Sequence, residues 1–161
     1  MAEPQRAPVA APRLPGARFL IAEARYYDGV GAMLLEGAQA AFAAAGAAFD
    51  VIAVPGALEI PAAIAIALDA AQGEARPYDG AVALGCVVRG ETFHFEIVAG
   101  ESARALMDMS VARKLALGNG ILTVETLPQA EERADPRRGD KGGDAARAAL
   151  KLAALKRSVT R

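Results

Sequence analysis

The strongest constraint on the fold of this chain is a set of four short apolar runs with little alternation between apolar and polar residues. The runs span residues 18–24, 48–54, 80–88 and 120–124. A strand without such alternation has both faces buried, which is typical of a parallel sheet covered by helices on both sides. We therefore predict four buried, parallel strands.

Segments rich in good helix formers follow the runs. We expect helices over residues 30–45, 58–71, 91–117, 127–134 and 144–157. Strand and helix alternate four times and one more helix follows, so the predicted fold is a three-layer α/β/α sandwich, flavodoxin-like, with a four-stranded parallel sheet. Residues 1–16 are rich in proline and are predicted to be a flexible N-terminal arm, with a single domain over residues 17–161.

Composition excludes several classes of protein. The chain has 161 residues, of which 53% are hydrophobic, and a net charge of −1, so it is neither disordered nor suited to wrapping nucleic acid. No apolar run approaches the roughly 18 residues of a membrane span. One cysteine forms no internal disulfide and the N-terminus resembles no targeting segment, so we expect a cytoplasmic protein.

Small side chains dominate the apolar residues. Alanine is abundant, aromatic residues make up 5% of the chain and tryptophan is absent. Each small side chain buries little area, so we expect the chain to bury further surface against copies of itself.

Ligands of such sheets bind beside the carboxyl ends of the strands, so the loops after the four runs form the candidate site. Tyr26 follows the first run, and its ring can stack on a flat heterocycle or cover the core. Glu59 follows the second run at a helix start, where it can accept hydrogen bonds from hydroxyls or complement the helix dipole. Cys86 lies within the third run and is interpreted as a core residue.

The third loop holds Thr92 and the only histidine, His94. Thr92 and the N–H groups of the helix start can bind an anion, and His94 is either a proton carrier or a structural residue. Arg133 and Lys141 follow the fourth run, and both can bind a phosphate or a carbonyl oxygen. Dinucleotide-binding, P-loop and nucleophile-elbow motifs are missing, and one histidine with one cysteine predicts no metal site.

Four motifs, in this order, resemble the lumazine synthase family: VPGALEIP, GCVVRGETFHFE, GILTVETLPQAEERA and DKGGDAARAAL. The resemblance extends over residues 18–157, and EARYYDG and GNGILTVE are most similar to the alphaproteobacterial type. It implies a transferase of riboflavin biosynthesis that condenses 5-amino-6-(D-ribitylamino)uracil with L-3,4-dihydroxy-2-butanone 4-phosphate. The products are 6,7-dimethyl-8-ribityllumazine, phosphate and water, and neither a cofactor nor a metal is implied.

The resemblance also implies a role for each matching residue. His94 would transfer protons, Arg133 would bind the phosphate, and Lys141 would lie near the reacting carbonyl. The implied substrate-binding residues comprise a stacking aromatic, a ribityl-binding segment, a strand end, a phosphate-binding turn and two further residues. They are Tyr26; Ala57, Leu58 and Glu59; Cys86, Val87 and Val88; Glu91 and Thr92; and Asn119 and Arg133.

Two residues depart from the pattern common in the family. Asn119 stands where many members have a phenylalanine that the neighbouring subunit places against the ring, and Tyr27 stands where asparagine is common. An amide stacks less well than a phenyl ring, so we expect weaker substrate binding. Two other hypotheses stay open: a noncatalytic flavin- or lumazine-binding protein on the same scaffold, and a structural shell protein.

The family assembles as pentamers, in many members as twelve pentamers in a hollow icosahedral shell, with each active site between adjacent chains. The resemblance therefore implies a homo-oligomer, either a pentamer or a 60-subunit shell, in which the N-terminal segment adds a strand to a neighbour's sheet. If Arg133 lies far from His94 within one chain, a neighbour must complete the site.

Overall fold

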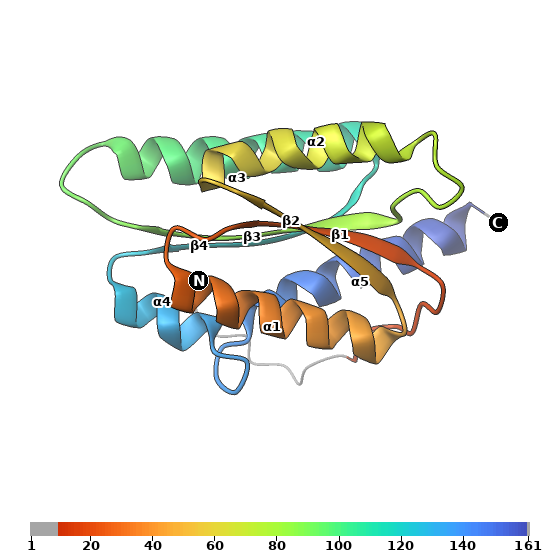
Figure 1. Ribbon diagram of the computed structural model, residues 1–161, viewed down its shortest axis with the longest axis horizontal. Coiled ribbons are helices and arrows are strands. Elements are labelled where there is room, and N and C mark those ends of the chain that lie inside the picture. Colours follow the sequence, from red (N-terminus) through yellow and green to blue (C-terminus); the bar gives the residue numbers. More distant parts are fainter. Residues whose placement is uncertain (1–9, 161) are drawn as a thin grey trace.

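The structure, a computed structural model that describes residues 10–160, contains one parallel sheet of four strands (Figure 1). In the spatial order β2-β1-β3-β4, the strands are Ala48–Val54, Arg18–Ala24, Gly80–Val88 and Ala116–Val124. Neighbouring strands are parallel throughout. β3 and β4 remain paired to their last residues, Val88 and Val124.

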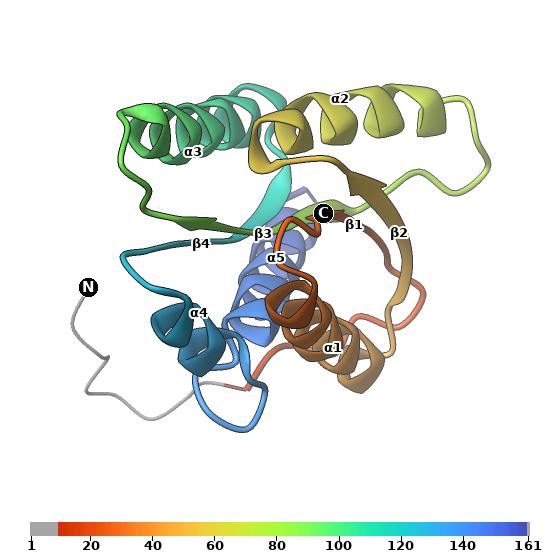
Figure 2. The ribbon, with the colours of Figure 1, turned by 60° about the vertical axis from the view of Figure 1, so that its left-hand side comes forward.

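Helices cover both faces of the sheet (Figure 2). On one face, α1 (Asp28–Ala45), α4 (Leu127–Ala134) and α5 (Lys141–Val159) pack together. The other face carries α2 (Ile60–Ala71), α3 (His94–Arg113) and a short 3-10 turn, η1, over Ala57–Glu59. The three-layer, flavodoxin-like fold predicted from the sequence is therefore confirmed. None of the described helices combines the length and the apolar character needed to cross a membrane.

Two apolar cores join the three layers. Successive residues of a strand point to opposite faces, so β1 supplies both cores. Phe19 belongs to the larger core, under α1, α4 and α5, where its ring stacks on Phe42 with centroids 4.6 Å apart. Leu20 belongs to the smaller core, under α2 and α3, together with Ile60 and Ile64.

The helix predicted over residues 91–117 is wrong at both ends. α3 begins at His94, and it ends at Arg113 because Lys114 adopts a left-handed conformation with φ 50°. The Leu115 N–H then bonds to the Ser110 carbonyl at 2.9 Å. The chain enters β4 at Ala116, four residues before the predicted start of that strand. Lysine rarely adopts this conformation, so nothing in the sequence marks the end of the helix.

Four other elements also differ from their predictions. α2 begins at Ile60, two residues after its predicted start, and the 3-10 turn η1 precedes it. β2 is an edge strand with exposed residues rather than a buried strand. α1 begins two residues before its predicted start, at Asp28. α5 begins at Lys141, three residues before its predicted start. Gly142 would weaken an isolated helix, but it is tolerated in α5 because it lies against α1. A Cβ on Gly142 would lie 1.9 Å from the Leu34 carbonyl oxygen, so only glycine permits this contact.

Residues 10–16 of the predicted arm belong to the described part of the chain, and residues 1–9 lie outside it. Leu14 is buried in the larger core, and its N–H donates to the Ala45 carbonyl at 2.9 Å. Gly16 has a φ of 80°, which turns the chain into β1. This part of the segment therefore contacts the domain of its own chain.

Cys86 lies on β3 and faces the larger core, with 9% of its surface exposed. Burial disfavours the thiolate and raises the pKa of the thiol from its ordinary value near 9 to about 11. The sulfur is therefore a neutral thiol of low reactivity at neutral pH. The prediction that Cys86 is a core residue is confirmed.

We predict that Gly118→Ala lowers the free energy of unfolding by about 3 kcal/mol. A Cβ at residue 118 would lie 1.9 Å from the Ala145 carbonyl oxygen, so α5 would have to move away from β4. Chemical denaturation at fixed protein concentration measures the change. Gly73→Ala is the control, because within residues 10–160 no atom other than those of residues 72–74 lies within 4 Å of a Cβ placed there. Equal effects of the two substitutions would contradict the close packing of α5 on β4.

We also predict that a thiol reagent labels native Cys86 about a hundredfold more slowly at neutral pH than it labels the chain in urea. An unfolded thiol ionises at lower pH than the native one. The stability contributed by the neutral native thiol is therefore complete below about pH 9 and is lost as the pH rises towards 11. Absorbance of the released reagent measures the rate from the single thiol of the chain. Rapid, complete labelling of the native protein at neutral pH would rule out the buried position.

Candidate functional site

The carboxyl ends of the parallel strands lie at one edge of the sheet, here termed the carboxyl edge. The Arg89 N–H donates to the Val124 carbonyl at 2.9 Å, which extends the pairing of β3 and β4 into the loop after β3. Loops at residues 25–27, 55–59, 89–93 and 125–126 follow the four strands. Most of the predicted site residues lie in or beside these loops.

Two tyrosines follow β1. The Tyr26 ring is 76% exposed, and it meets the Tyr27 ring edge-on with centroids 5.1 Å apart. Tyr27 packs against the larger core, and burial raises the pKa of its hydroxyl above the ordinary value. Tyr26 is therefore supported by a fixed neighbour and exposed enough to stack on a flat ligand.

The 3-10 turn η1 holds the segment 57–59 against α3 and β3. Ala57 is buried, whereas Leu58 and Glu59 are exposed. A Cβ on Gly56 would lie 3.0 Å from Glu59 Oε2, so the carboxylate folds back over the loop that precedes it. An exposed carboxylate at this position can accept hydrogen bonds from a polyol.

The end of β3 leads directly to His94. Cys86 and Val87 are buried and Val88 is half-buried, and the chain then enters an exposed loop that holds Glu91 and Thr92. Thr92 Oγ1 accepts a hydrogen bond from the His94 N–H at 3.4 Å, and α3 begins at His94. The first N–H groups of a helix have no carbonyl partner within it, so donors for an anion lie beside the exposed imidazole.

Arg133 lies on the opposite face of the sheet from His94. It belongs to the last turn of α4, which packs with α1 on the face opposite α3 (Figure 2). Its Nη1 donates to the Gln129 carbonyl at 3.0 Å, and its side chain is exposed. Gly139 lets the next loop close on α4, since a Cβ there would lie 2.6 Å from Arg133 Cα. One nitrogen of the guanidinium is therefore held by the backbone of α4, and the rest of the group is open to solvent.

Lys141 is the first residue of α5, three residues before the predicted start of that helix, and it lies on the same face as Arg133. Its Nζ lies 3.1 Å from Asp144 Oδ2. Asp140 accepts a hydrogen bond from the Gly143 N–H at 3.3 Å, and Arg147 pairs with both Asp140 and Asp144. This network fixes the start of α5 and with it the position of Lys141.

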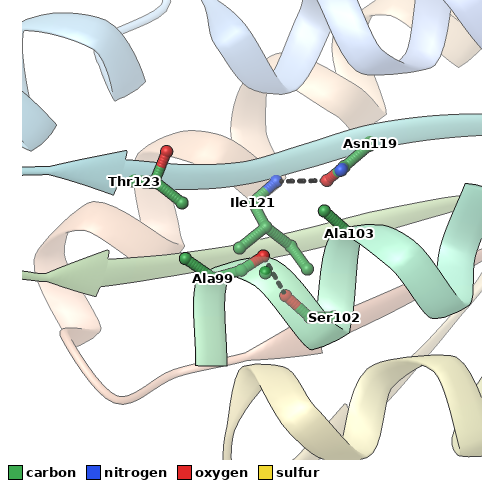
Figure 3. A pocket seen from close by; sticks show the side chains of 7 residues that line it. Ala99, Ser102, Ala103, Asn119, Ile121 and Thr123 are labelled. Carbon is green, nitrogen blue, oxygen red and sulfur yellow. Dashed lines mark hydrogen bonds between the residues drawn. The ribbon is translucent and has the colours of Figure 1, made fainter. Parts of the chain in front are cut away.

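Asn119 lies in the middle of β4, at an open groove of about 340 Å³ between β4 and α3 (Figure 3). Its Oδ1 accepts a hydrogen bond from the Ile121 N–H at 3.0 Å, so the amide lies along its own strand. The groove is lined by small residues of α3 and by β4 side chains that share one face: Ala99, Gly100, Ser102, Ala103, Asn119, Ile121 and Thr123. Asn119 is therefore outside the loops that surround His94.

Sequence reasoning missed Arg89, whose guanidinium joins three elements at the carboxyl edge. It pairs with Glu96 of α3 and with Glu125 of the loop after β4, the latter at 2.9 Å. It also lies 4.2 Å from the centre of the Phe95 ring. These four residues, Arg89, Phe95, Glu96 and Glu125, form the Arg89 cluster. Glu125 lies 36 positions from Arg89, and no sequence signal links the two.

Apart from Asn119, the predicted site residues thus fall into two groups within one chain. Tyr26, segment 57–59, strand end 86–88 and segment 91–94 lie at the carboxyl edge, where they can hold a flat polar ring and move a proton. Arg133 and Lys141 lie on the opposite face and can bind an anion, with the sheet between them and His94. Within residues 10–160, no three His, Cys, Asp or Glu side chains are grouped to hold a metal ion.

Comparison with known proteins shows the family of the chain. A family model described as 6,7-dimethyl-8-ribityllumazine synthase matches residues 16–157. A protein of that name from Methylocella silvestris is 69% identical over 142 residues, which are 88% of this chain and 87% of the relative. A Rhodopseudomonas palustris protein named 6,7-dimethyl-8-ribityllumazine synthase 1 is 61% identical over 162 residues, 100% of this chain and 99% of the relative. The chain belongs to the 6,7-dimethyl-8-ribityllumazine synthase family.

Proposed function

We propose that the chain condenses 5-amino-6-(D-ribitylamino)uracil with L-3,4-dihydroxy-2-butanone 4-phosphate in the penultimate step of riboflavin biosynthesis. The products are 6,7-dimethyl-8-ribityllumazine, phosphate and water. The observation that carries the proposal is the gathering of exposed Tyr26, Glu59 and His94 at one edge of the sheet in a member of this family. The single, buried cysteine fits a cytoplasmic location.

The uracil substrate would bind at the carboxyl edge. Tyr26 would stack on the pyrimidine ring, and the backbone of strand end 86–88 would bind its polar edge. Segment 57–59 would hold the ribityl chain, with the Glu59 carboxylate accepting hydrogen bonds from its hydroxyls. Asn119 would reach this ring from a neighbouring chain, in place of the phenylalanine common in the family.

The reaction would proceed by Schiff-base formation, phosphate elimination, ring closure and dehydration. Each step moves protons, which an imidazole at the position of His94 carries well near neutral pH. The turn at 91–92 and Arg133 would hold the phosphate while it leaves, through N–H donors and a fixed cation. Lys141 would lie near the reacting carbonyl. Much of the remaining acceleration would come from holding two substrates together.

We further propose that the active site lies between adjacent chains of a homo-oligomer. A substrate beside His94 meets Arg133 and Lys141 only if a neighbouring chain supplies them, because the sheet separates these residues within one chain. The assembly would be a pentamer or a shell of twelve pentamers, which sedimentation velocity distinguishes by size.

The surface of α3 supports self-association. Phe93, Ile97, Met107 and Val111 recur at a spacing that puts them on one face of this helix, and Met107 and Val111 are 64% and 71% exposed. Exposed apolar stripes of this kind mark surfaces that other chains cover. A second copy of the chain would bury the stripe and place another α4 near the first chain's carboxyl edge.

The activity is tested by mixing the purified protein with both substrates and following the fluorescence of the lumazine product. Product formation above the uncatalysed rate supports the enzyme. Tight binding of the product without turnover would instead support the noncatalytic binding protein. If an intact assembly shows neither product binding nor turnover, the result supports the structural shell protein.

We predict that His94→Ala lowers kcat about a hundredfold yet leaves a measurable rate, because substrate positioning survives. Arg133→Ala should raise KM for the phosphorylated substrate about tenfold and change KM for the uracil much less. Steady-state kinetics with each substrate varied in turn measures both effects. Arg137→Ala is the matched control in the same segment, because that exposed side chain pairs only locally with Asp135. Unchanged constants in the Arg133 variant would refute its assignment.

We predict that His94→Ala and Arg133→Ala chains complement each other. When equal amounts are dissociated and reassembled together, about a quarter of the sites receive an intact His94 from one chain and an intact Arg133 from its neighbour. At substrate concentrations well below the wild-type KM, the mixture should therefore show about a quarter of the wild-type activity, whereas Arg133→Ala alone retains about a tenth and His94→Ala about a hundredth. Arg133→Ala mixed with Lys141→Ala is the control and should show no activity beyond that of the two separate variants, since both lesions affect the same half of the site. No recovery in the first mixture would place the whole site within one chain.

A further inference from the structure

We propose that Arg89 is a positioning residue that holds the loop leading to His94 and the loop leading to Arg133 in a fixed mutual position. This inference rests on the proposed function and adds to it a residue that contacts neither substrate. Its effect would be to fix the two half-sites of one chain relative to each other.

The contacts of the guanidinium carry the proposal. Arg89 follows β3, and its two carboxylate partners lie on different elements: Glu96 is in the first turn of α3, two residues after His94, and Glu125 immediately precedes the N-cap of α4. The Phe95 ring covers the guanidinium, 4.2 Å from its carbon. A planar cation with several N–H donors can serve two carboxylates at once, which a single ammonium does less well.

The carboxylates depend on this cation. Arg89 holds the pKa of Glu96 below its ordinary value. The other oxygen of Glu96, Oε2, is covered and has no hydrogen-bond partner within residues 10–160. The Glu96 side chain is 38% exposed, so without Arg89 its carboxylate would turn towards solvent and would no longer hold the first turn of α3 in place.

The other loop is fixed at the same point. The Glu125 N–H donates to Gln129 Oε1 at 2.9 Å, so the backbone of Glu125 is bound to α4 while its side chain is bound to Arg89. Movement of α4 is thereby transmitted to the start of α3, where His94 lies. Since the proposed site uses His94 of one chain and Arg133 of the next, this link sets how the two halves meet around the assembly.

The chain contains a matched control. Arg18, at the opposite end of the sheet, also pairs with two carboxylates, Asp50 and Glu74, and lies 4.3 Å from the centre of an aromatic ring, that of Tyr78. Arg18→Gln removes the same kind of interactions as Arg89→Gln, but it does so away from the carboxyl edge. The two variants therefore separate a loss of stability from a loss of positioning.

The experiment compares Arg89→Gln, Arg89→Lys and Arg18→Gln by steady-state kinetics and by hydrogen–deuterium exchange with mass spectrometry. In Arg89→Gln we expect kcat to fall about tenfold, with KM for the uracil changed less than about twofold. Backbone amides in both segments 89–97 and 125–134 should exchange about fivefold faster. Arg89→Lys should recover part of kcat, and Arg18→Gln should change neither kcat nor exchange in these segments.

Faster exchange in only one of the two segments would overturn the coupling. Unchanged kcat with a lowered melting temperature would reduce Arg89 to a stabilising residue. If Arg89→Gln does not fold, Arg89→Lys decides between the same outcomes, because it retains the charge without the planar fork. If the wild-type chain forms no product, the proposed function is contradicted but the role of Arg89 is not. The exchange measurement reports the coupling of the two loops without any substrate.

Discussion

The structure depends above all on the parallel pairing of β3 with β4, which runs in register from Gly80 opposite Ala116 to Val88 opposite Val124. This pairing brings the loops after the two strands to the same place. From there the chain turns to opposite faces, into α3 after β3 and into α4 after β4. The backbone hydrogen bonds between β3 and β4 therefore place the two loops side by side. The residues that follow these loops nevertheless lie on opposite faces of the sheet. The division of the candidate site between two faces is a direct result of this topology.

The small side chains of this sequence serve close packing within the chain. Gly118 and Gly120 of β4 lie against Ala145 of α5, and Gly142 lies against the backbone of α1 at Leu34. The same approach of α5 to β4 and α1 fixes the start of α5. The abundance of small side chains thus reflects helices that approach the sheet and each other closely. The exposed residues of α3 leave further surface for other chains.

The apolar runs predict the fold because burial on both faces leaves a clear pattern in the sequence. β1, β3 and α4 have the predicted bounds. The end of α3 could not be predicted, because Lys114 adopts a conformation that its residue type disfavours. In the candidate site, Glu59 and His94 could be singled out because each lies where the chain passes from a strand into the next helix. Arg89 could not, because Glu125 is adjacent to it only through the pairing of β3 with β4.

The apolar pattern predicts that β2 is buried, but β2 is an exposed edge strand. This exposure has a consequence for the newly synthesised chain. Within the described residues, β2 pairs with β1 along one side only. An open strand edge is a template on which any other extended chain can add by backbone hydrogen bonds. A chain that has folded but not yet met its partners therefore carries both this edge and the apolar stripe of α3. Ordered association and aggregation therefore compete for this chain. The outcome depends on the rate of synthesis relative to the rate at which folded chains associate with each other.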